Sequence, residues 1–300
     1  MIKQLKEIFR QSIVLLYRNS KFVWLYWGTN LAFGIVLSLP LYYMLSDHLM
    51  HSSLSQLLSS GIDYIWYLQF RSLYDTEIGE IPYMIYGTVG IYVLIQVFYL
   101  GGLISVFNIV KKNEYVDFFY GGVKHWYRFS KVMLLSLVFF AVAFKINDLT
   151  GQLLSYLFAN QEKIIFEFIL RASRYILLIF LLGLVMLVGD YLKIALAVKD
   201  STKVLKEIYP LLLFLKNNFN RVFTVFFLVA VLGAMGAVVY NVIEGFLPKN
   251  HYFYLLLAFI LQQMLIIFRL LVRMLFSATE IYLYKDINAQ IIPTQAEEVD

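Results

Sequence analysis

The chain alternates between long apolar runs and short polar segments that are rich in lysine and arginine. A helix that crosses a hydrocarbon core of about 30 Å needs roughly 20 consecutive, mostly apolar residues. Six runs reach that length, which predicts a polytopic membrane protein that is an all-α helical bundle. The predicted spans cover residues 22–45, 81–110, 129–146, 171–198, 222–246 and 252–276, the last continuing as helix to residue 284.

The positive charges between the spans predict an orientation. Lys and Arg number five in residues 1–21, five in 111–131 and six in 193–221. The intervening loops hold one each, at Arg71, Lys163 and Lys249. Because positive loops stay in the cytoplasm, both termini are predicted to be cytoplasmic, in a bacterial inner membrane.

Composition narrows the classes of function. The chain is 61% hydrophobic and 18% aromatic, and its mean hydropathy is +0.72, so its main solvent is lipid. The net charge of +5 is spread between spans rather than gathered in one patch, so we expect no nucleic-acid partner. Cysteine is absent, which excludes disulfides and thiolate metal sites. We expect no cofactor, no metal site and no catalytic residues.

Some of the segments between spans have the pattern of amphipathic helices lying in the membrane interface. In residues 2–16, apolar side chains recur at helical spacing opposite Lys3, Lys6, Glu7 and Arg10. The loop 47–80 combines acidic residues with Leu, Ile and Trp, which predicts a short helix on the outer surface.

An internal threefold repeat is also predicted. Residues 5–26, 115–136 and 205–226 align without gaps, each with an acidic, an apolar and an aromatic residue followed twelve positions later by a basic one. The matching sets are Glu7, Asp117 and Glu207; Ile8, Phe118 and Ile208; Phe9, Phe119 and Tyr209; and Lys21, Lys131 and Arg221. The predicted domain is a single membrane domain, 1–284, with repeat units of about 1–110, 111–200 and 201–284. Residues 285–300 are predicted to form a polar, disordered cytoplasmic tail.

Several short motifs resemble a known family. They are the surface segment Phe118-Phe119-Tyr120 leading to Trp126, the span end Gly189-Asp190 followed by Ala195, and the run 278–286. Together they resemble the six-helix membrane domain that precedes the catalytic part of some bacterial glycerophosphodiester phosphodiesterases, and its stand-alone relatives of unknown function. The resemblance implies the six-helix fold but no activity, since the phosphodiesterase domain and its metal and acid/base residues have no counterpart in this sequence.

Ionisable residues inside predicted spans are candidates for function because they are costly to bury in lipid. The candidates are Asp190, Arg269, Arg273 and Glu280. Arg269 and Arg273 are four residues apart on one helix face, at a depth similar to that of Asp190. A pair between Asp190 and one arginine would leave the other guanidinium for a phosphate or lipid headgroup. Alternatively, the arginines extend to the interface and Asp190 accepts local hydrogen bonds.

Three functions stay open at this point. A non-enzymatic module that organises membrane lipids or a membrane protein partner is favoured by the surface helices and short loops. A small transporter or permease component is the alternative, because Pro40 and the glycine pairs are typical of broken helices. An intramembrane lipid-modifying enzyme would need a nucleophile or paired carboxylates at one depth, and the spans offer neither.

Overall fold

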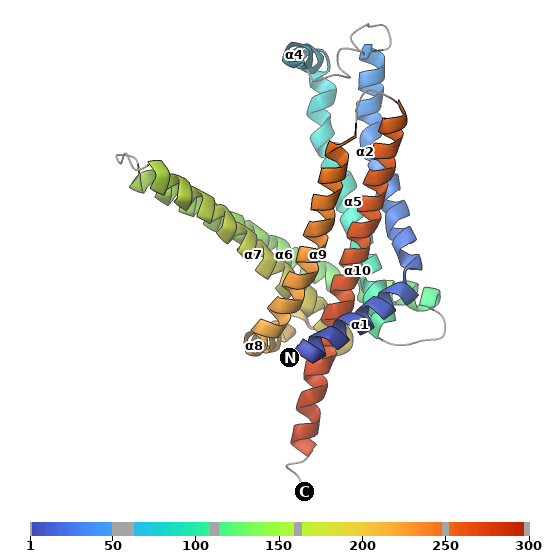
Figure 1. Ribbon diagram of the computed structural model, residues 1–300, viewed down its shortest axis with the longest axis vertical. Coiled ribbons are helices and arrows are strands. Elements are labelled where there is room, and N and C mark those ends of the chain that lie inside the picture. Colours follow the sequence, from blue (N-terminus) through green and yellow to red (C-terminus); the bar gives the residue numbers. More distant parts are fainter. Residues whose placement is uncertain (1, 50–62, 109–113, 159–163, 248–251, 297–300) are drawn as a thin grey trace. The chain divides into compact units, whose positions relative to one another are not determined.

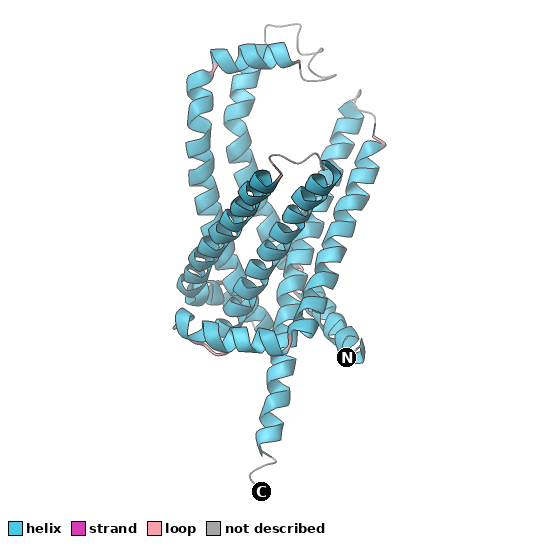
Figure 2. Ribbon diagram, turned by 90° about the vertical axis from the view of Figure 1, so that its left-hand side faces the viewer, coloured by secondary structure: helices cyan, strands magenta, loops and turns pink. Residues whose placement is uncertain are grey.

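The computed structural model describes residues 2–49, 63–108, 114–158, 164–247 and 252–296, and in these ranges it consists of helices joined by short turns (Figure 1). No strand occurs among these residues (Figure 2). The helices are α1 (Ile2–Arg18), α2 (Lys21–Leu49), α4 (Tyr64–Leu73), α5 (Asp75–Asn108), α6 (Glu114–Leu157), α7 (Ile164–Val198), α8 (Val204–Asn217), α9 (Phe219–Gly245) and α10 (Tyr252–Ala296).

Six of these helices, α2, α5, α6, α7, α9 and α10, are long and apolar enough to cross a membrane. α2, α6, α7 and α10 contain their predicted spans in full, and α9 ends one residue before the predicted end at 246. α5 covers its predicted span to residue 108, and residues 109–110 lie outside the described residues. The predicted all-α fold class is confirmed. The chain is a multi-pass membrane protein. Most observed helices are longer than the predicted spans, because their first or last turns are polar and lie beyond the apolar run.

The three aligned segments differ in how the first helix of each meets the next. α1 ends before α2, and α8 ends before α9, whereas the corresponding segment of the second unit is continuous with its span as α6. At the two breaks, Asn19 Nδ2 donates to the Leu15 carbonyl at 2.9 Å and Asn218 Nδ2 donates to the Phe214 carbonyl at 3.0 Å. An asparagine that bonds its local backbone favours a helix end. The positions of α6 aligned with Asn19 and Asn218 are Phe129, which is fully buried, and Arg128, so α6 has no asparagine at this point.

Helix α10 extends well past residue 285, where the sequence predicts the start of a disordered tail. It remains helical to Ala296. The apolar side chains Ile281, Leu283, Tyr284 and Ile287 are buried, and this periodic face stabilises the helix where the local composition has become polar. The predicted boundary at residue 285 therefore does not coincide with a helix end.

The chain divides into two compact units. Unit 1 contains residues 1–13, 97–228 and 275–300, and unit 2 contains residues 14–96 and 229–274. In unit 1, α6 packs against α7 and α7 against α8. Unit 1 contains the C-terminal ends of α5, α7 and α10, where large buried side chains such as Leu103, Tyr191 and Ile281 are concentrated.

Within unit 1, glycines allow α5 and α6 to approach closely. A Cβ atom added to Gly102 would collide with the backbone carbonyl and ring of Phe118, and one added to Gly122 would lie 2.7 Å from the ring of Phe98. A Cβ at Gly101 would be 3.2 Å from the Gly121 carbonyl. This arrangement explains the paired glycines on the two helices, because close backbone approach between membrane helices requires small residues.

The end of α7 is joined electrostatically to α6 through Asp200. The Ser201 N–H donates to the Leu196 carbonyl, and Asp200 has a left-handed φ of 50°. This is a common C-terminal cap of a helix, in which glycine usually occupies the left-handed position. Lys124 Nζ donates to Asp200 Oδ2 at 2.9 Å, and Arg128 Nη1 donates to Oδ1 at 2.7 Å. These hydrogen bonds lower the pKa of Asp200 from 3.8 to about 2.

Asp200→Asn is expected to reduce thermal stability at neutral pH and to have little effect near pH 2. Since the pKa is lower in the folded protein, the ion pairs contribute stability above the ordinary pKa of aspartate, and this contribution is lost as pH falls through about 2. Asparagine tolerates the left-handed backbone, so the comparison isolates the charge. Thermal midpoints of both proteins in detergent, followed from pH 7 to pH 2, give the measurement. A difference that stayed constant over this range would contradict the assignment.

Candidate functional site

The four candidate residues from the sequence are divided between the two units. Asp190 and Glu280 belong to unit 1, and Arg269 and Arg273 belong to unit 2. The proposed pairing of Asp190 with an arginine therefore stays a prediction. Each unit contains its own cluster of polar side chains around these residues.

In unit 1, Asp190 is paired within its own helix. Lys193 Nζ donates to Asp190 Oδ1 at 2.8 Å, one turn along α7. Lys193 was not singled out from the sequence, although its spacing of three from Asp190 is a recognisable signal for such a pair. Asp190 and Lys193 both act electrostatically on the carboxyl group of Glu280. We call Asp190, Tyr191, Lys193 and Glu280 the Glu280 cluster.

Two groups in the Glu280 cluster are buried without a hydrogen-bond partner among the described residues. They are the Oε1 atom of Glu280, a residue that is 2% exposed, and the hydroxyl of Tyr191, which is 0% exposed. The Tyr191 ring packs against Phe214, which in turn packs against Tyr284. Buried polar groups of this kind are uncommon in folded proteins and mark the cluster as a candidate site.

A small cavity lies next to this aromatic stack in unit 1. Its volume is about 280 Å³. Lys199 Nζ donates to Glu207 Oε2 at 2.8 Å at its wall, which raises the pKa of Lys199. The residues that line it are Ala195, Lys199, Glu207, Pro210, Leu211, Phe214, Asn217, Asn218, Tyr284 and Asn288. The cavity offers one ion pair, several amides and a phenol.

In unit 2, polar side chains connect α2, α5 and α10. Arg273 Nη1 donates to Gln96 Oε1 at 2.8 Å, and the Arg273 guanidinium carbon lies 5.9 Å from the centre of the Tyr26 ring. We call Tyr26, Gln96, Arg269 and Arg273 the Arg273 cluster. Two further bonds join the same helices: Tyr92 OH donates to Asn30 Oδ1 at 2.6 Å, and Trp27 Nε1 donates to Gln263 Oε1 at 3.0 Å.

The uncharged members of this network were not predicted from the sequence. Asn30, Gln96 and Gln263 lie inside apolar runs, where an amide must find a partner on another helix or remain costly to bury. The location of an amide side chain inside an apolar run therefore predicts an interhelical hydrogen bond, but it does not identify the partner residue. Only the structure pairs Gln96 with Arg273.

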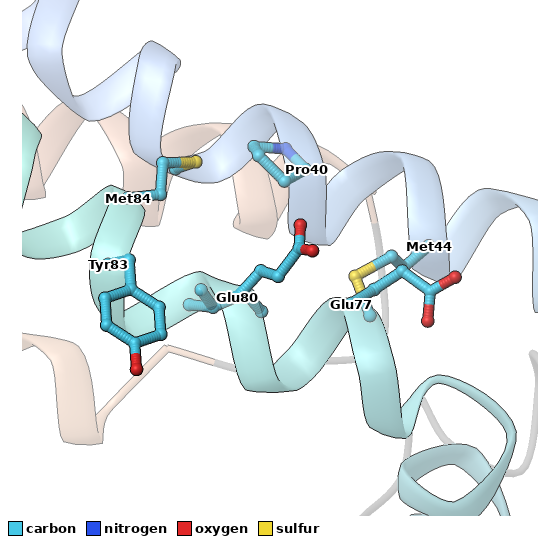
Figure 3. Close-up of a pocket in the computed structure, with 7 residues that line it drawn as sticks. Pro40, Met44, Glu77, Glu80, Tyr83 and Met84 are labelled. Atoms are coloured by element: carbon cyan, nitrogen blue, oxygen red, sulfur yellow. The ribbon is translucent and has the colours of Figure 1, made fainter.

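A second feature of unit 2 is an open groove between α2 and α5 with a volume of about 740 Å³. We call it the Glu77–Glu80 groove. Its lining residues are Pro40, Met44, Glu77, Glu80, Ile81, Tyr83 and Met84. Figure 3 shows the Glu80 carboxylate directed toward α2 beside Pro40, and the Glu77 carboxylate beside Met44. Thr76 Oγ1 donates to Glu77 Oε2 at 2.8 Å.

The groove combines two chemical characters. Pro40, Met44, Ile81 and Met84 provide aliphatic and thioether surface, whereas Glu77 and Glu80 provide negative charge. α2 continues as a helix through Pro40, so this proline does not break the span. Within the described ranges, no group of three or more His, Asp or Glu residues is arranged to hold a metal ion.

These features define a class of protein, a multi-pass helical membrane protein with polar clusters inside its helical units. No family model, curated protein or solved structure matches the chain. The resemblance to the membrane domain of glycerophosphodiester phosphodiesterases therefore stays a prediction.

Proposed function

We propose that this protein is a non-enzymatic membrane module that binds and organises lipids, with both termini in the cytoplasm of a bacterial cell. The observation that carries the proposal is the Glu77–Glu80 groove. The groove lies between α2 and α5, two helices long and apolar enough to span a membrane. Most of its lining side chains are apolar, and it contains two carboxylates near the first residues of α5. Those properties match an amphiphile with a positively charged headgroup.

The position of the groove fits a lipid headgroup. At a rise of about 1.5 Å per residue, Pro40 lies ~28 Å along α2 from its first residue, and Glu80 lies ~8 Å from the start of α5. For a hydrocarbon core of about 30 Å, both residues are then close to the boundary at which α2 ends. The carboxylates would meet an ammonium group there, and Met44, Ile81 and Met84 would contact the acyl chains.

Exposed apolar faces on the surface segments support the same function. Tyr209 on α8 is 71% exposed and Tyr127 on α6 is 70% exposed, and each lies near lysine or arginine residues. An apolar face with a basic border favours contact with the headgroup layer of a membrane that contains anionic lipid.

Glu77→Gln/Glu80→Gln is expected to lower the retention of phosphatidylethanolamine about tenfold, since losing a charged hydrogen-bond partner costs roughly 1.5–3 kcal/mol. Glutamine keeps the side-chain shape and can still accept the bond from Thr76. The measurement is native mass spectrometry of the protein purified in mixed phosphatidylethanolamine and phosphatidylglycerol, with both bound lipids counted.

The matched control is Asp148→Asn/Glu167→Gln, which removes two carboxylates from α6 and α7 outside the groove. Equal loss of phosphatidylethanolamine in both double variants would overturn the proposal. Uptake of a solute into proteoliposomes that required Glu80 would instead identify a small transporter, and lipid turnover would identify an intramembrane enzyme.

A further inference from the structure

The Arg273 cluster has the features of an anion-binding site. The Gln96 carbonyl oxygen is already occupied, because it accepts from Arg273 Nη1 at 2.8 Å. A guanidinium has five N–H groups arranged in a plane, so this bond fixes the direction of the others. The Tyr26 ring, 5.9 Å from the guanidinium carbon, further restricts the orientation of Arg273.

The side-chain amide of Gln96 contains a buried hydrogen-bond donor without an acceptor among the described residues. Gln96 is only 4% exposed, and its Nε2 atom has no hydrogen-bond partner among the described residues. Leaving a buried N–H group without an acceptor is unfavourable by roughly 1–3 kcal/mol. An oxygen atom placed beside both Gln96 Nε2 and the Arg273 guanidinium would satisfy this donor.

Arg269 adds a second positive charge one turn earlier on α10. Its side chain is exposed, and it forms no hydrogen bond or ion pair with another residue in the described part of the chain. The positive charge of Arg269 acts electrostatically on the hydroxyl group of Tyr240 in α9. Two like charges four residues apart on a helix repel each other, and an anion between them would remove that repulsion.

The depth of the cluster matches a lipid headgroup. At about 1.5 Å per residue, Arg269 lies ~25 Å and Arg273 ~32 Å from the first residue of α10, and Gln96 lies ~32 Å from the start of α5. Tyr26 is ~8 Å from the start of α2, which begins at that same boundary. In α5, Gln96 is ~24 Å beyond Glu80, so for a hydrocarbon core of about 30 Å it lies ~6 Å inside the boundary at which α2 begins. A phosphate at this boundary is within the length of an extended arginine side chain.

We propose that Arg269, Arg273 and Gln96 bind the phosphate of an anionic phospholipid in this leaflet. The two guanidinium groups and the Gln96 amide donate to the phosphate oxygens, and the diacyl chains lie along the apolar surface of α10. The site shares no residue with the Glu77–Glu80 groove and prefers the opposite headgroup charge. Failure of either proposal is therefore recognisable without the other.

Gln96→Glu is the most specific test of this site. The substitution keeps the side-chain size, retains an oxygen for Arg273 and replaces the Nε2 donor by a second, negatively charged oxygen. A carboxylate at this position would pair with Arg273 and repel phosphate, so we expect retained phosphatidylglycerol to fall about tenfold or more while phosphatidylethanolamine is unchanged. Arg269→Gln/Arg273→Gln is expected to give the same result. Native mass spectrometry in the same lipid mixture measures both.

The control is Arg171→Gln/Arg174→Gln, a second arginine pair on a spanning helix, α7. It removes the same net charge, so an equal loss of phosphatidylglycerol would show a charge effect without a site and overturn the proposal. Wild-type retention in Gln96→Glu would also overturn it. Millimolar inorganic phosphate is expected not to displace the lipid. Displacement at that concentration would assign the site to a soluble phosphate and contradict a lipid ligand.

Discussion

Replacing Gly102 by alanine is expected to lower the yield of folded protein sharply, although only one methyl group is added. The new Cβ would collide with the Phe118 carbonyl and lie 2.9 Å from the Phe118 ring, and Phe118 is 0% exposed. A backbone carbonyl in a helix cannot move aside without displacing its neighbours. Separation of α5 from α6 is therefore expected to cost about 1–3 kcal/mol or more.

Gly90→Ala is the matched control, because it makes the same change in the same helix. A Cβ at Gly90 would have no atom within 4 Å, so its effect is limited to helix propensity, where alanine is favoured over glycine by about 1 kcal/mol. Size-exclusion profiles and thermal midpoints in detergent measure both variants. Equal behaviour of Gly102→Ala and Gly90→Ala would contradict the close approach of α5 and α6.

Glu280→Gln is expected to raise the thermal midpoint. Glu280 is 2% exposed and its Oε1 atom has no hydrogen-bond partner among the described residues, so no hydrogen bond replaces the water that this oxygen loses on folding. Glutamine has the same shape and no charge to desolvate. A gain of about 1–3 kcal/mol corresponds to a rise of roughly 2–10 °C for a chain of this size.

The neighbours of Glu280 make the result informative in either direction. Tyr191→Phe, which removes the other unpartnered group of the cluster, is expected to be neutral or stabilising. If Glu280→Gln instead lowered the midpoint, the carboxylate would have a favourable partner in the folded protein, with Lys193 the nearest candidate. A loss of lipid retention together with increased stability would assign Glu280 to function, since such sites often reduce stability.

The spans were predictable because the apolar runs are long and the polar segments between them short. The break between α1 and α2 and the continuity of α6 were not predictable. The asparagines at the two breaks, Asn19 and Asn218, occupy different aligned positions, and a phenylalanine is aligned with Asn19 both in α6, which continues, and at Phe219, where α9 begins. The continuation of α10 past residue 285 was also missed, because the buried side chains of Ile281, Tyr284 and Ile287 stabilise the helix where the local composition has become polar.

The candidate site was predictable only in part. Charged residues in apolar runs are conspicuous, so Asp190, Arg269, Arg273 and Glu280 could be selected from the sequence. Their neighbours depend on which helix faces meet, and the amide of Gln96 and the carboxylates of Glu77 and Glu80 gained a role only from the structure. The threefold repeat and the interfacial position of the N-terminal helix stay predictions. Phe22, Val132 and Val222, which align in the three repeat units, are all buried to within 1%.

The composition of unit 1 has a consequence for how the protein is made. This unit combines residues 1–13 with residues 97–228 and 275–300, so its packing depends on segments that leave the ribosome at very different times. While the middle segment is being inserted, the surfaces later covered by Ala278, Ile281 and Tyr284 have no intramolecular partner. We therefore expect the nascent chain to become resistant to membrane proteases only after residues 275–300 have been synthesised.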